Sequence, residues 1–296
     1  MLDAKIETFL AVYQNKSYTK ASEKLCITQP AVTQHIQSLE KHYACKLFEY
    51  SNRQLKITKA GELLHKHVLN LKANEQIIKQ KLLQISQEKK ALKFAATLTI
   101  GEFTLRPILD DLIQTFHEYN ITMYIDNTKT VLQMLESGEI DFALIEGLFS
   151  KSDYETRLYK RAPFILTVPI AHPLLKKKYV FLEDLKEETI IVREKGSGSR
   201  EILERGLFDK NYVLGDFKKT IEIGNVNVIK EMVKKSIGIS FMYEDAADEE
   251  IKKGELAILP IEDFVVEREF NFIHIKNNIM QDDLDAFFCF LKNNIS

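Results

Sequence analysis

Residues 17–39, SYTKASEKLCITQPAVTQHIQSL, predict two short helices joined by a tight turn. In the second helix, four apolar residues recur at steps of four, three and four, so they share one side of a 3.6-residue helix. They are Val32, Ile36, Leu39 and Tyr43. Thr28 offers a hydroxyl for the N-cap of this helix, and Pro30 stands in its first turn, where a missing N–H is tolerated.

The opposite side of the second helix is polar and nearly free of acidic residues. Gln side chains can hydrogen-bond adenine bidentately, and Thr can contact the thymine methyl group. This side therefore has what a recognition helix in the major groove of double-stranded DNA requires. The residues expected to contact DNA from it are Gln29, Pro30, Thr33, Gln34 and Gln37. An ordinary surface helix with one polar face has the same periodicity and is the alternative.

The whole segment from residue 17 to residue 61 resembles the winged helix-turn-helix of the LysR-type transcriptional regulators. The residues that carry the resemblance are Ser17, Ala21, Leu25, Gln29, Pro30, Ala31, Val32, Thr33, Ile36, Leu39, Glu40, Leu47, Phe48, Arg53, Thr58, Ala60 and Gly61. A match of this density is far more specific than a short motif. It implies a DNA-binding domain over residues 1–58.

A β-hairpin, or wing, is expected after the recognition helix, with residues 51–54 at its tip. The resemblance implies that Arg53 meets phosphate or enters a minor groove, whereas a solvated loop charge is the alternative. Two positions depart from the family pattern, which usually has Gly in place of Ala44 and a basic residue in place of Tyr50. Ala44 is expected to strain the turn if its φ is positive, and Tyr50 to remove one phosphate contact.

Charge is divided unevenly along the 296 residues. Residues 1–90 hold fifteen Lys and Arg against eight Asp and Glu, while residues 91–296 hold twenty-six against thirty-five. This asymmetry predicts a basic front segment that binds an anionic polymer, and it argues against nucleic-acid binding over the whole surface.

The cysteines and the apolar runs restrict the class of protein further. Cys26, Cys45 and Cys289 are odd in number and lack metal-ligand spacing, so no disulfide framework, metal or cofactor is predicted. Cys26 and Cys289 are expected to be packed thiols. No signal peptide and no apolar run near membrane-spanning length is found, which predicts a cytoplasmic, nucleoid-associated protein.

One long linker helix is expected over residues 59–88. Leu64, Leu71, Ile78 and Ile85 are spaced seven apart, with Val68 and Leu82 filling the neighbouring position. Such a narrow apolar seam favours a dimerisation helix, although packing on its own domain is the alternative. The resemblance implies a homodimer, often paired into a tetramer, that binds an inverted-repeat operator. RNA polymerase is a further candidate partner.

From residue 89 onward, short apolar runs alternate with amphipathic helices, one of them expected over Leu105–Tyr119. The alternation predicts an α/β domain with a largely parallel sheet. Ligands of such sheets bind at the carboxyl ends of strands, beside helix N-termini that favour an anion. The residues at these ends are Thr97, Thr99, Ile100, Asn127, Thr128, Glu146, Ser197, Ser199 and Asn225. Each Thr or Ser taken singly could be a plain helix cap.

The strings TLTIGEFTLRPIL, IDFALIEG, VREKGSGSRE and KEMVKKSIGIS look like landmarks of the LysR-type effector domain. The resemblance implies two α/β lobes like those of periplasmic binding proteins, with subdomain I at 91–161 and 267–296 and subdomain II at 162–266. It implies that Thr97 and Thr99 bind a small effector and that Glu146, Ser197 and Ser199 line the opposite walls. Glu146 is awkward for an anionic effector.

The sequence therefore predicts an α/β protein with an all-α winged helix-turn-helix, a linker helix and a two-lobed effector domain. Its expected function is ligand-responsive transcriptional regulation. A solute-binding protein shares the predicted cleft but not the basic front segment. An enzyme would need a nucleophile and base or a metal cluster, and His117, His172 and His274 have no convincing partner in the sequence.

Overall fold

The computed structural model describes residues 3–51, 54–84, 90–276, 278 and 280–294. The chain divides into two compact units. The N-terminal unit comprises Met1–Leu83 with Glu136–Glu139, and the C-terminal unit comprises Gln84–Leu135 with Ile140–Ser296. Within the described residues, no helix has the length and apolar character needed to cross a membrane.

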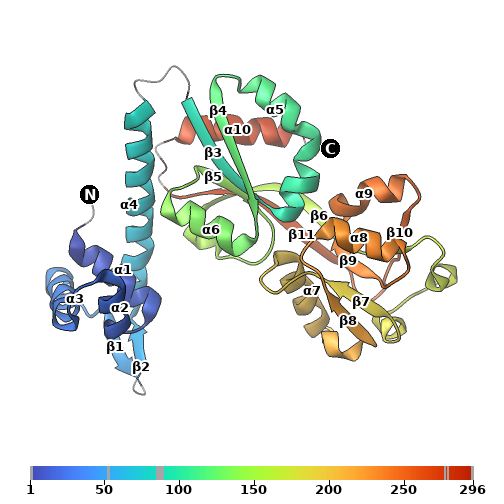
Figure 1. Ribbon diagram of the computed structural model, residues 1–296, viewed down its shortest axis with the longest axis horizontal. Helices are drawn as coiled ribbons and strands as arrows, with labels where there is room; N and C mark the ends of the chain where they lie inside the picture. The colour runs from blue at the N-terminus through green and yellow to red at the C-terminus, as the bar shows by residue number, and fades with distance from the viewer. Residues whose placement is uncertain (1–2, 52–53, 85–89, 277, 279, 295–296) are drawn as a thin grey trace. The chain divides into compact units, whose positions relative to one another are not determined.

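The N-terminal unit is a three-helix domain followed by a hairpin and a long helix (Figure 1). Its elements are α1 (Ala4–Asn15), α2 (Tyr18–Leu25), α3 (Gln29–Tyr43), β1 (Phe48–Ser51), β2 (Gln54–Ile57) and α4 (Lys59–Gln84). The side chains of Asp3, Ser17 and Thr28 accept hydrogen bonds from backbone N–H groups and so cap the first three helices. Phe9, Val12, Val32, Ile36, Leu47 and Phe48 form the core.

Helix α3 and the hairpin of β1 and β2 are held together by one acidic side chain. Glu40 of α3 accepts hydrogen bonds from the backbone N–H groups of Leu47 at 2.9 Å and Phe48 at 3.4 Å, and it pairs with Lys46 at 2.6 Å. The connecting residue Ala44 has a φ of 52°, which is the left-handed conformation in which the sequence predicted strain. The predicted hairpin is confirmed, since Ser51 pairs with Gln54.

Two expectations for the N-terminal unit are wrong. Tyr43, expected on the apolar side of α3, is 46% exposed, because the helix ends there and the ring only packs edge-on against His42. Cys26, expected to be packed, is exposed because it is the left-handed residue that ends α2, with a φ of 54°. Cys289 of the C-terminal unit is exposed too, since its helix turns Leu284 and Phe287 inward instead.

The predicted seam of α4 divides between two faces. Val68 is buried in the core of the N-terminal unit, and Leu64 packs against that core. Leu71, Ile78 and Leu82 are exposed together with Leu63, and we call these four residues the α4 stripe. Ile85 lies outside the described residues.

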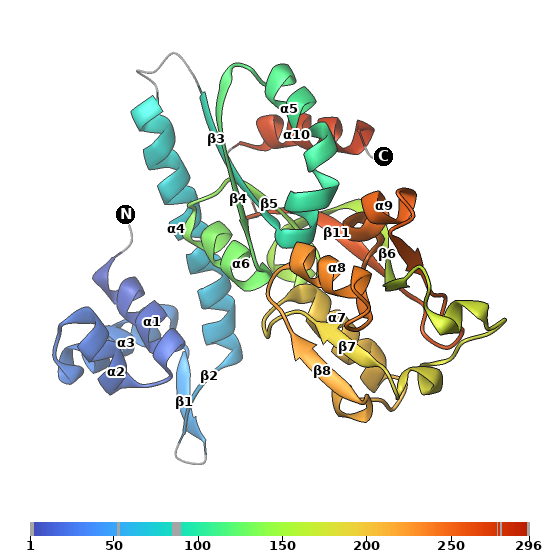
Figure 2. The same cartoon turned by 45° about the vertical axis from the view of Figure 1, so that its right-hand side comes forward.

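The C-terminal unit is built on a seven-stranded mixed sheet (Figure 2). Its strand order is β10-β6-β11-β5-β3-β4, and β9 also pairs with β6. The strands are β3 (Lys90–Thr97), β4 (Tyr119–Asp126), β5 (Phe142–Ile145), β6 (Glu155–Pro169), β9 (Ser240–Tyr243), β10 (Leu256–Ile258) and β11 (Val266–His274). A separate parallel pair is formed by β7 (Thr189–Val192) and β8 (Lys219–Glu222).

The expectation of a largely parallel sheet is wrong for this seven-stranded sheet. Only β3 with β4 and β3 with β5 pair in parallel, whereas the other four pairings are antiparallel. The reason is that β6 and β11 run in opposite directions between the two lobes. The segments at the two predicted subdomain boundaries pair directly with each other, with Ala162 opposite Arg268 and Phe164 opposite Val266.

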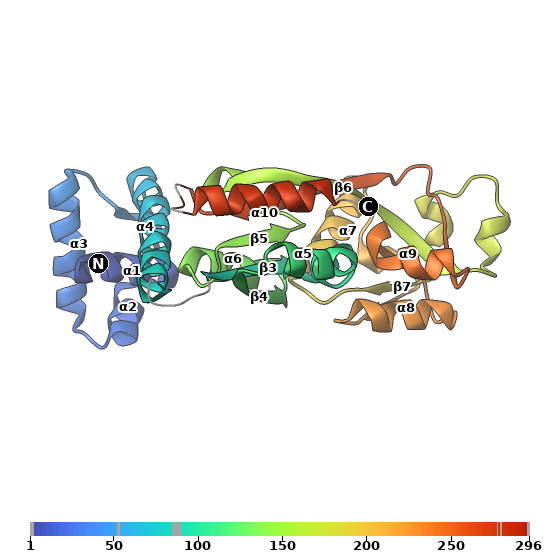
Figure 3. The same cartoon turned by 90° about the horizontal axis from the view of Figure 1, so that it is seen from above.

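Helices cover the sheet of each lobe (Figure 3). They are α5 (Leu109–Thr115), α6 (Thr128–Ser137), α7 (Gly198–Phe208), α8 (Val226–Lys234), α9 (Glu244–Lys252) and α10 (Gln281–Asn293). Phe142 stacks on Phe94 at 4.9 Å and on Phe272 at 4.6 Å in the core of the first lobe. The second lobe buries Ile191, Ile229, Val233 and Met242.

The continuous helix expected over Leu105–Tyr119 is wrong. The chain instead forms a π-helical turn over Ile100–Thr104, a 3-10 turn over Arg106–Ile108 and the short helix α5. Pro107 lacks the N–H that an uninterrupted helix needs. Beyond α5, the ring of Phe116 packs 3.9 Å from that of Phe287, and Tyr119 already belongs to β4.

Candidate functional site

The first candidate site is the outer face of α3. Gln29, Pro30, Gln34 and Gln37 are exposed along it, and Thr33 is half-buried. The Thr33 hydroxyl donates to the Gln29 carbonyl oxygen at 3.1 Å. No hydrogen bond within the described part of the chain engages the amides of Gln34 and Gln37, which leaves them free for base edges. Arg53 lies outside the described residues.

The second candidate site lies where the parallel strands of the first lobe end. In this sheet Thr97 pairs with Asp126, and Ala96 pairs with Leu144, so the ends of β3, β4 and β5 meet. The backbone N–H of Glu146 donates to the Thr97 hydroxyl at 3.4 Å. The Thr128 hydroxyl donates to the carbonyl oxygen of Glu146 at 3.1 Å. Glu146 is therefore held by the loops of two neighbouring strands.

The second lobe reaches the same place through the start of α7. A Cβ atom built on Gly198 would lie 3.0 Å from the Thr128 hydroxyl oxygen and 3.3 Å from the Glu146 carbonyl oxygen. Ser197 and Ser199 are buried on either side of this glycine, and their hydroxyl oxygens are 3.0 Å apart. The Ser197 side chain does not cap α7, so backbone N–H groups at the start of this helix are left for another acceptor.

Glu146 is the titratable residue at this junction, and only 4% of it is exposed. Burial raises the pKa of the Glu146 carboxyl to about 7, because the charged form loses water. A hydrogen bond from its own backbone, the positive charge of Arg193 and a hydrogen bond from Thr99 oppose this rise, while Asp245 adds to it. Arg193 is a weak counter-ion, since its guanidinium binds both carboxylate oxygens of Glu194 at 2.8 and 2.9 Å.

The predicted effector residues fall into two groups. Thr97, Thr99, Ile100, Thr128, Glu146, Ser197 and Ser199 are all buried around this junction. Asn127 and Asn225 instead serve as helix caps: Asn127 accepts from the backbone N–H of Thr130 at 3.0 Å, and Asn225 accepts from that of Val228 at 3.1 Å. Asn225 is moreover exposed, so its side chain is the least suited of the set to enclose a ligand.

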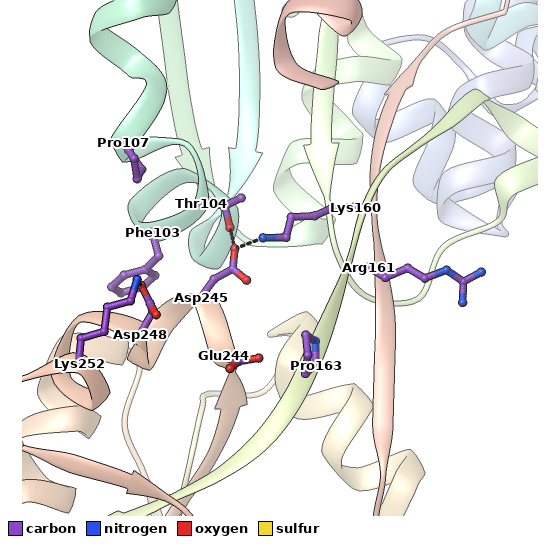
Figure 4. A pocket seen from close by; sticks show the side chains of 10 residues that line it. All are labelled: Phe103, Thr104, Pro107, Lys160, Arg161, Pro163, Glu244, Asp245, Asp248 and Lys252. Atoms are coloured by element: carbon purple, nitrogen blue, oxygen red, sulfur yellow. Dashed lines mark hydrogen bonds and ion pairs between the residues drawn. The ribbon is translucent and has the colours of Figure 1, made fainter. Parts of the chain in front are cut away.

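The C-terminal unit also holds a pocket of about 440 Å³ that the sequence analysis did not identify (Figure 4). In it, the Asp245 carboxylate accepts from the Thr104 hydroxyl at 2.6 Å and from the Lys160 ammonium at 3.0 Å. Figure 4 shows Thr104 and Lys160 both pointing at Asp245, while the Arg161 guanidinium points away. These residues are far apart in the sequence and belong to no motif, so no spacing could have revealed them.

The chain matches two family models. A model described as "Bacterial regulatory helix-turn-helix protein, lysR family" covers residues 4–62, and one described as "LysR substrate binding domain" covers residues 86–296.

Named relatives match nearly the full length. The transcriptional regulator CysL of Bacillus subtilis is 31% identical over 290 residues, which are 98% of this chain and 96% of CysL. The transcriptional activator CmpR of Synechocystis is 28% identical over 286 residues, 95% of this chain and 93% of CmpR. These relatives are transcriptional regulators rather than enzymes.

Solved structures match the fold. A full-length OxyR variant of Pseudomonas aeruginosa aligns with a TM-score of 0.60 at 19% identity, covering 98% of this chain and 99% of OxyR. The regulatory domain of Synechocystis CcmR aligns with a TM-score of 0.63 at 22% identity, covering 70% of this chain and 98% of that domain. The predicted fold class is confirmed: a helix-turn-helix domain is joined to a two-lobed α/β domain.

Proposed function

The chain belongs to the LysR family of DNA-binding transcriptional regulators, and from this premise we propose how it binds its operator and its effector. The outer face of α3 contacts base edges of an inverted-repeat site in the nucleoid, while the wing formed by β1 and β2 contacts the DNA phosphate backbone. The closed loops around Glu146 and Gly198 hold a small effector whose binding changes operator affinity or activation. The proposed domains are residues 1–58, 59–88 and 89–296, with subdomains 91–161 plus 267–296 and 162–266.

The observation that carries the DNA proposal is the exposed amide row of α3 in a basic segment. The polar residues Gln29, Gln34 and Gln37 are exposed, whereas Val32 and Ile36 on the other side of the same helix are buried. The fifteen Lys and Arg of residues 1–90 supply attraction to phosphates that is independent of sequence. Specific binding then arises from the amides, and affinity falls steeply with salt.

Pairing of two chains is proposed through the α4 stripe. Leu63, Leu71, Ile78 and Leu82 are exposed apolar side chains on one helix, at 60, 60, 43 and 62% exposure. Such a row is unfavourable in water and is typical of a surface that another helix covers. A homodimer would present two α3 helices to the two halves of an inverted repeat, and two dimers would form a tetramer. Contact with RNA polymerase is proposed on the same family basis.

The effector proposal is supported by the buried polar loops at the strand ends. Backbone N–H groups at the start of α7, together with the hydroxyls of Thr99, Ser197 and Ser199, suit the acid group of a small metabolite. The regulatory domain of CcmR was solved in complex with 2-PG, and we propose a site in the corresponding domain here.

The test of this function is an operator titration followed by an effector screen. DNA upstream of the chain's own gene and of its neighbours is footprinted with the purified protein at several salt concentrations. Protection of an inverted repeat, with an affinity that falls as salt rises, is the expected result. Binding with no preference for any duplex sequence would contradict the assignment of α3. Metabolites are then screened for a rise in the melting midpoint and for altered footprints.

A further inference from the structure

Six buried side-chain polar atoms in the described part of the two-lobed domain lack a hydrogen-bond partner, and three of these atoms lie at or next to the proposed effector site. They are Oε2 of Glu146, the hydroxyl oxygen of Tyr243 and Nε of Arg268. Buried polar atoms are nearly always hydrogen-bonded, so each such atom calls for a physical account. The neighbouring polar side chains already have hydrogen-bond partners. They are Thr97, Thr128, Ser197 and Ser199.

The residues of these three atoms, which we call the cluster, are brought together by β11. The Tyr243 ring lies 4.9 Å from that of Phe270, two residues from Arg268 on this strand, and Ile145, the residue before Glu146, pairs with Asn271 of the same strand. Burial raises the pKa of Tyr243 well above its usual value, the charge of Glu146 adds to that rise, and the charge of Arg268 opposes it. Both charges therefore act on the same hydroxyl. Glu146 follows β5, Tyr243 ends β9 and Arg268 stands in β11, so the cluster draws on both lobes and on the strand that passes between them.

The surrounding packing fixes where the Tyr243 hydroxyl can go. Its ring lies 5.2 Å from that of Phe164 and 4.9 Å from that of Phe270, edge-on in both cases. Its backbone pairs with Phe164 on β6, and Arg268 pairs with Ala162 on the same strand. Tyr243 on β9 and Arg268 on β11 thus flank β6 in one sheet, and the Tyr243 side chain is fully buried there.

The other charged groups near Glu146 are already engaged. Arg193 binds Glu194 with two hydrogen bonds, and Asp245 is paired with Lys160 and Thr104. Among the described residues, Glu146 thus has one accepting oxygen to spare and no dedicated cation. Arg268 and Tyr243 have donors to spare and, in the same part of the chain, no dedicated acceptor. A ligand that satisfied all three residues would carry an acceptor group for Arg268 and Tyr243 and a donor group for Glu146.

We infer that the effector is a small hydroxy acid or amino acid. Its acid group accepts hydrogen bonds from Nε of Arg268 and from the Tyr243 hydroxyl, and its hydroxyl or ammonium group donates to Oε2 of Glu146. This inference rests on the proposed effector site and narrows the class of ligand that the site takes. It also removes the difficulty of Glu146 for an acidic ligand, because the carboxylate meets the donor end and not the acid end.

The experiment compares acids that differ only in the donor group. The melting midpoint of the full-length protein is measured with acetate, glycolate and glycine, with propionate, lactate, alanine and serine, and with succinate, malate and aspartate. A hydroxy or amino acid is expected to raise the midpoint by several degrees, and the parent acid without the donor is expected to leave it unchanged. Inorganic phosphate and sulfate serve as acids without a carbon skeleton.

Variants then assign the effect to the cluster. Glu146→Gln and Tyr243→Phe are expected to weaken ligand binding, so that at least ten times more ligand is needed for the same rise in the melting midpoint. The matched variants Glu187→Gln and Tyr179→Phe change the same residue types on the exposed surface and should keep the full shift. Because Tyr243→Phe removes only a hydroxyl that makes no hydrogen bond within the described residues, its melting without ligand shows whether the protein still folds.

Each outcome decides the inference. Equal shifts from acids with and without the donor, or a shift from phosphate or sulfate alone, would overturn the ligand class while leaving an effector site in place. The absence of any shift across the series would overturn it too. Operator footprints from the same preparations separate these results from a failure of the proposed function, since DNA binding does not require the cluster.

Discussion

Gly147 and Gly198 lie against each other across the two lobes of the C-terminal unit. A Cβ atom built on Gly147 would stand 3.1 Å from the Cα atom of Gly198, and Gly147 has a φ of 101° that side chains rarely adopt. Two glycines therefore allow the strand end of one lobe to touch the helix start of the other. The close approach depends on the lack of side chains at both positions.

Gly198→Ala is expected to hold the lobes apart. The added methyl group would meet the Thr128 hydroxyl at 3.0 Å and the Glu146 carbonyl at 3.3 Å, which is tighter than ordinary contact. Overpacking of this kind destabilises by about 1–3 kcal/mol. Denaturant unfolding measures the loss, and the screen for midpoint shifts should find weaker effector binding. Gly215→Ala, which meets nothing within 4 Å, is the control. Equal behaviour of the two variants would contradict the close approach.

Gln34→Ala and Gln37→Ala are each expected to weaken binding to the specific operator by about 1–3 kcal/mol, because each removes a base-edge contact. Binding to unrelated duplex DNA should change little, since phosphate attraction supplies it. Gln114→Ala, an exposed amide of the C-terminal unit, is the matched control. Titrations on both duplexes at one salt concentration check this, and an equal loss on both would point to misfolding instead.

Leu71→Glu and Ile78→Glu are expected to separate the chains. Each places a charge in the α4 stripe, where an apolar partner surface would have to bury it. Because Leu71 and Ile78 are 60 and 43% exposed within the single chain, its own fold should tolerate both changes. Sedimentation velocity reports the mass, and operator affinity should fall with it. Val265→Glu, at a position 87% exposed, should keep the assembly of the parent protein.

Glu146 is expected to make stability fall as pH rises toward neutrality. Its folded pKa of about 7 lies above the unfolded value of 4.5, so the folded state keeps a proton that the unfolded state releases. The stability it contributes is full below pH 4.5 and is lost as pH rises to 7, by about 3 kcal/mol in all. Urea unfolding of the parent protein and of Glu146→Gln at about pH 4.5, 6 and 8 checks this. The difference between the two should change across this window and then level off.

Tyr243→Phe is expected to leave the stability of the ligand-free protein unchanged or to raise it by about 1 kcal/mol. The hydroxyl is buried without a partner among the described residues, and removing an unsatisfied polar group relieves its desolvation cost. Tyr159→Phe is the comparison, because Tyr159 is buried as well. A clear loss of stability in Tyr243→Phe would show that the hydroxyl has a partner that supports the fold.

The sequence was sufficient for the elements that depend on local pattern. The N-cap at Thr28, the buried stripe of Val32 and Ile36, and the hairpin between Ser51 and Gln54 follow from neighbouring residues, and the structure contains all three. The exposure of Tyr43 was not predicted, because periodicity does not tell at which residue a helix extends beyond the core. The short helix α5 was wrongly predicted as part of a longer one, because the apolar pattern continues on both sides of Pro107 although the helix does not.

The candidate effector site was predictable only in outline. Topology places the ends of parallel strands together, so Thr97, Thr128 and Glu146 could be grouped before the structure was known. Tyr243 and Arg268 could not, since both lie within strands and gain significance only when β9 and β11 both pair with β6. The spare oxygen of Glu146 likewise depends on Arg193 pairing with Glu194, which no motif encodes.

The pairing of Ala162 with Arg268 bears on how the lobes can move. The two segments that connect the lobes, in β6 and β11, are hydrogen-bonded to each other as an antiparallel ladder, so they behave as one two-stranded ribbon instead of two independent linkers. A ribbon flexes and twists readily but hardly stretches or shears. The two lobes are therefore expected to open and close by a hinge motion at this ribbon. Substitutions that weaken the ladder should make that motion less restricted well before they unfold either lobe.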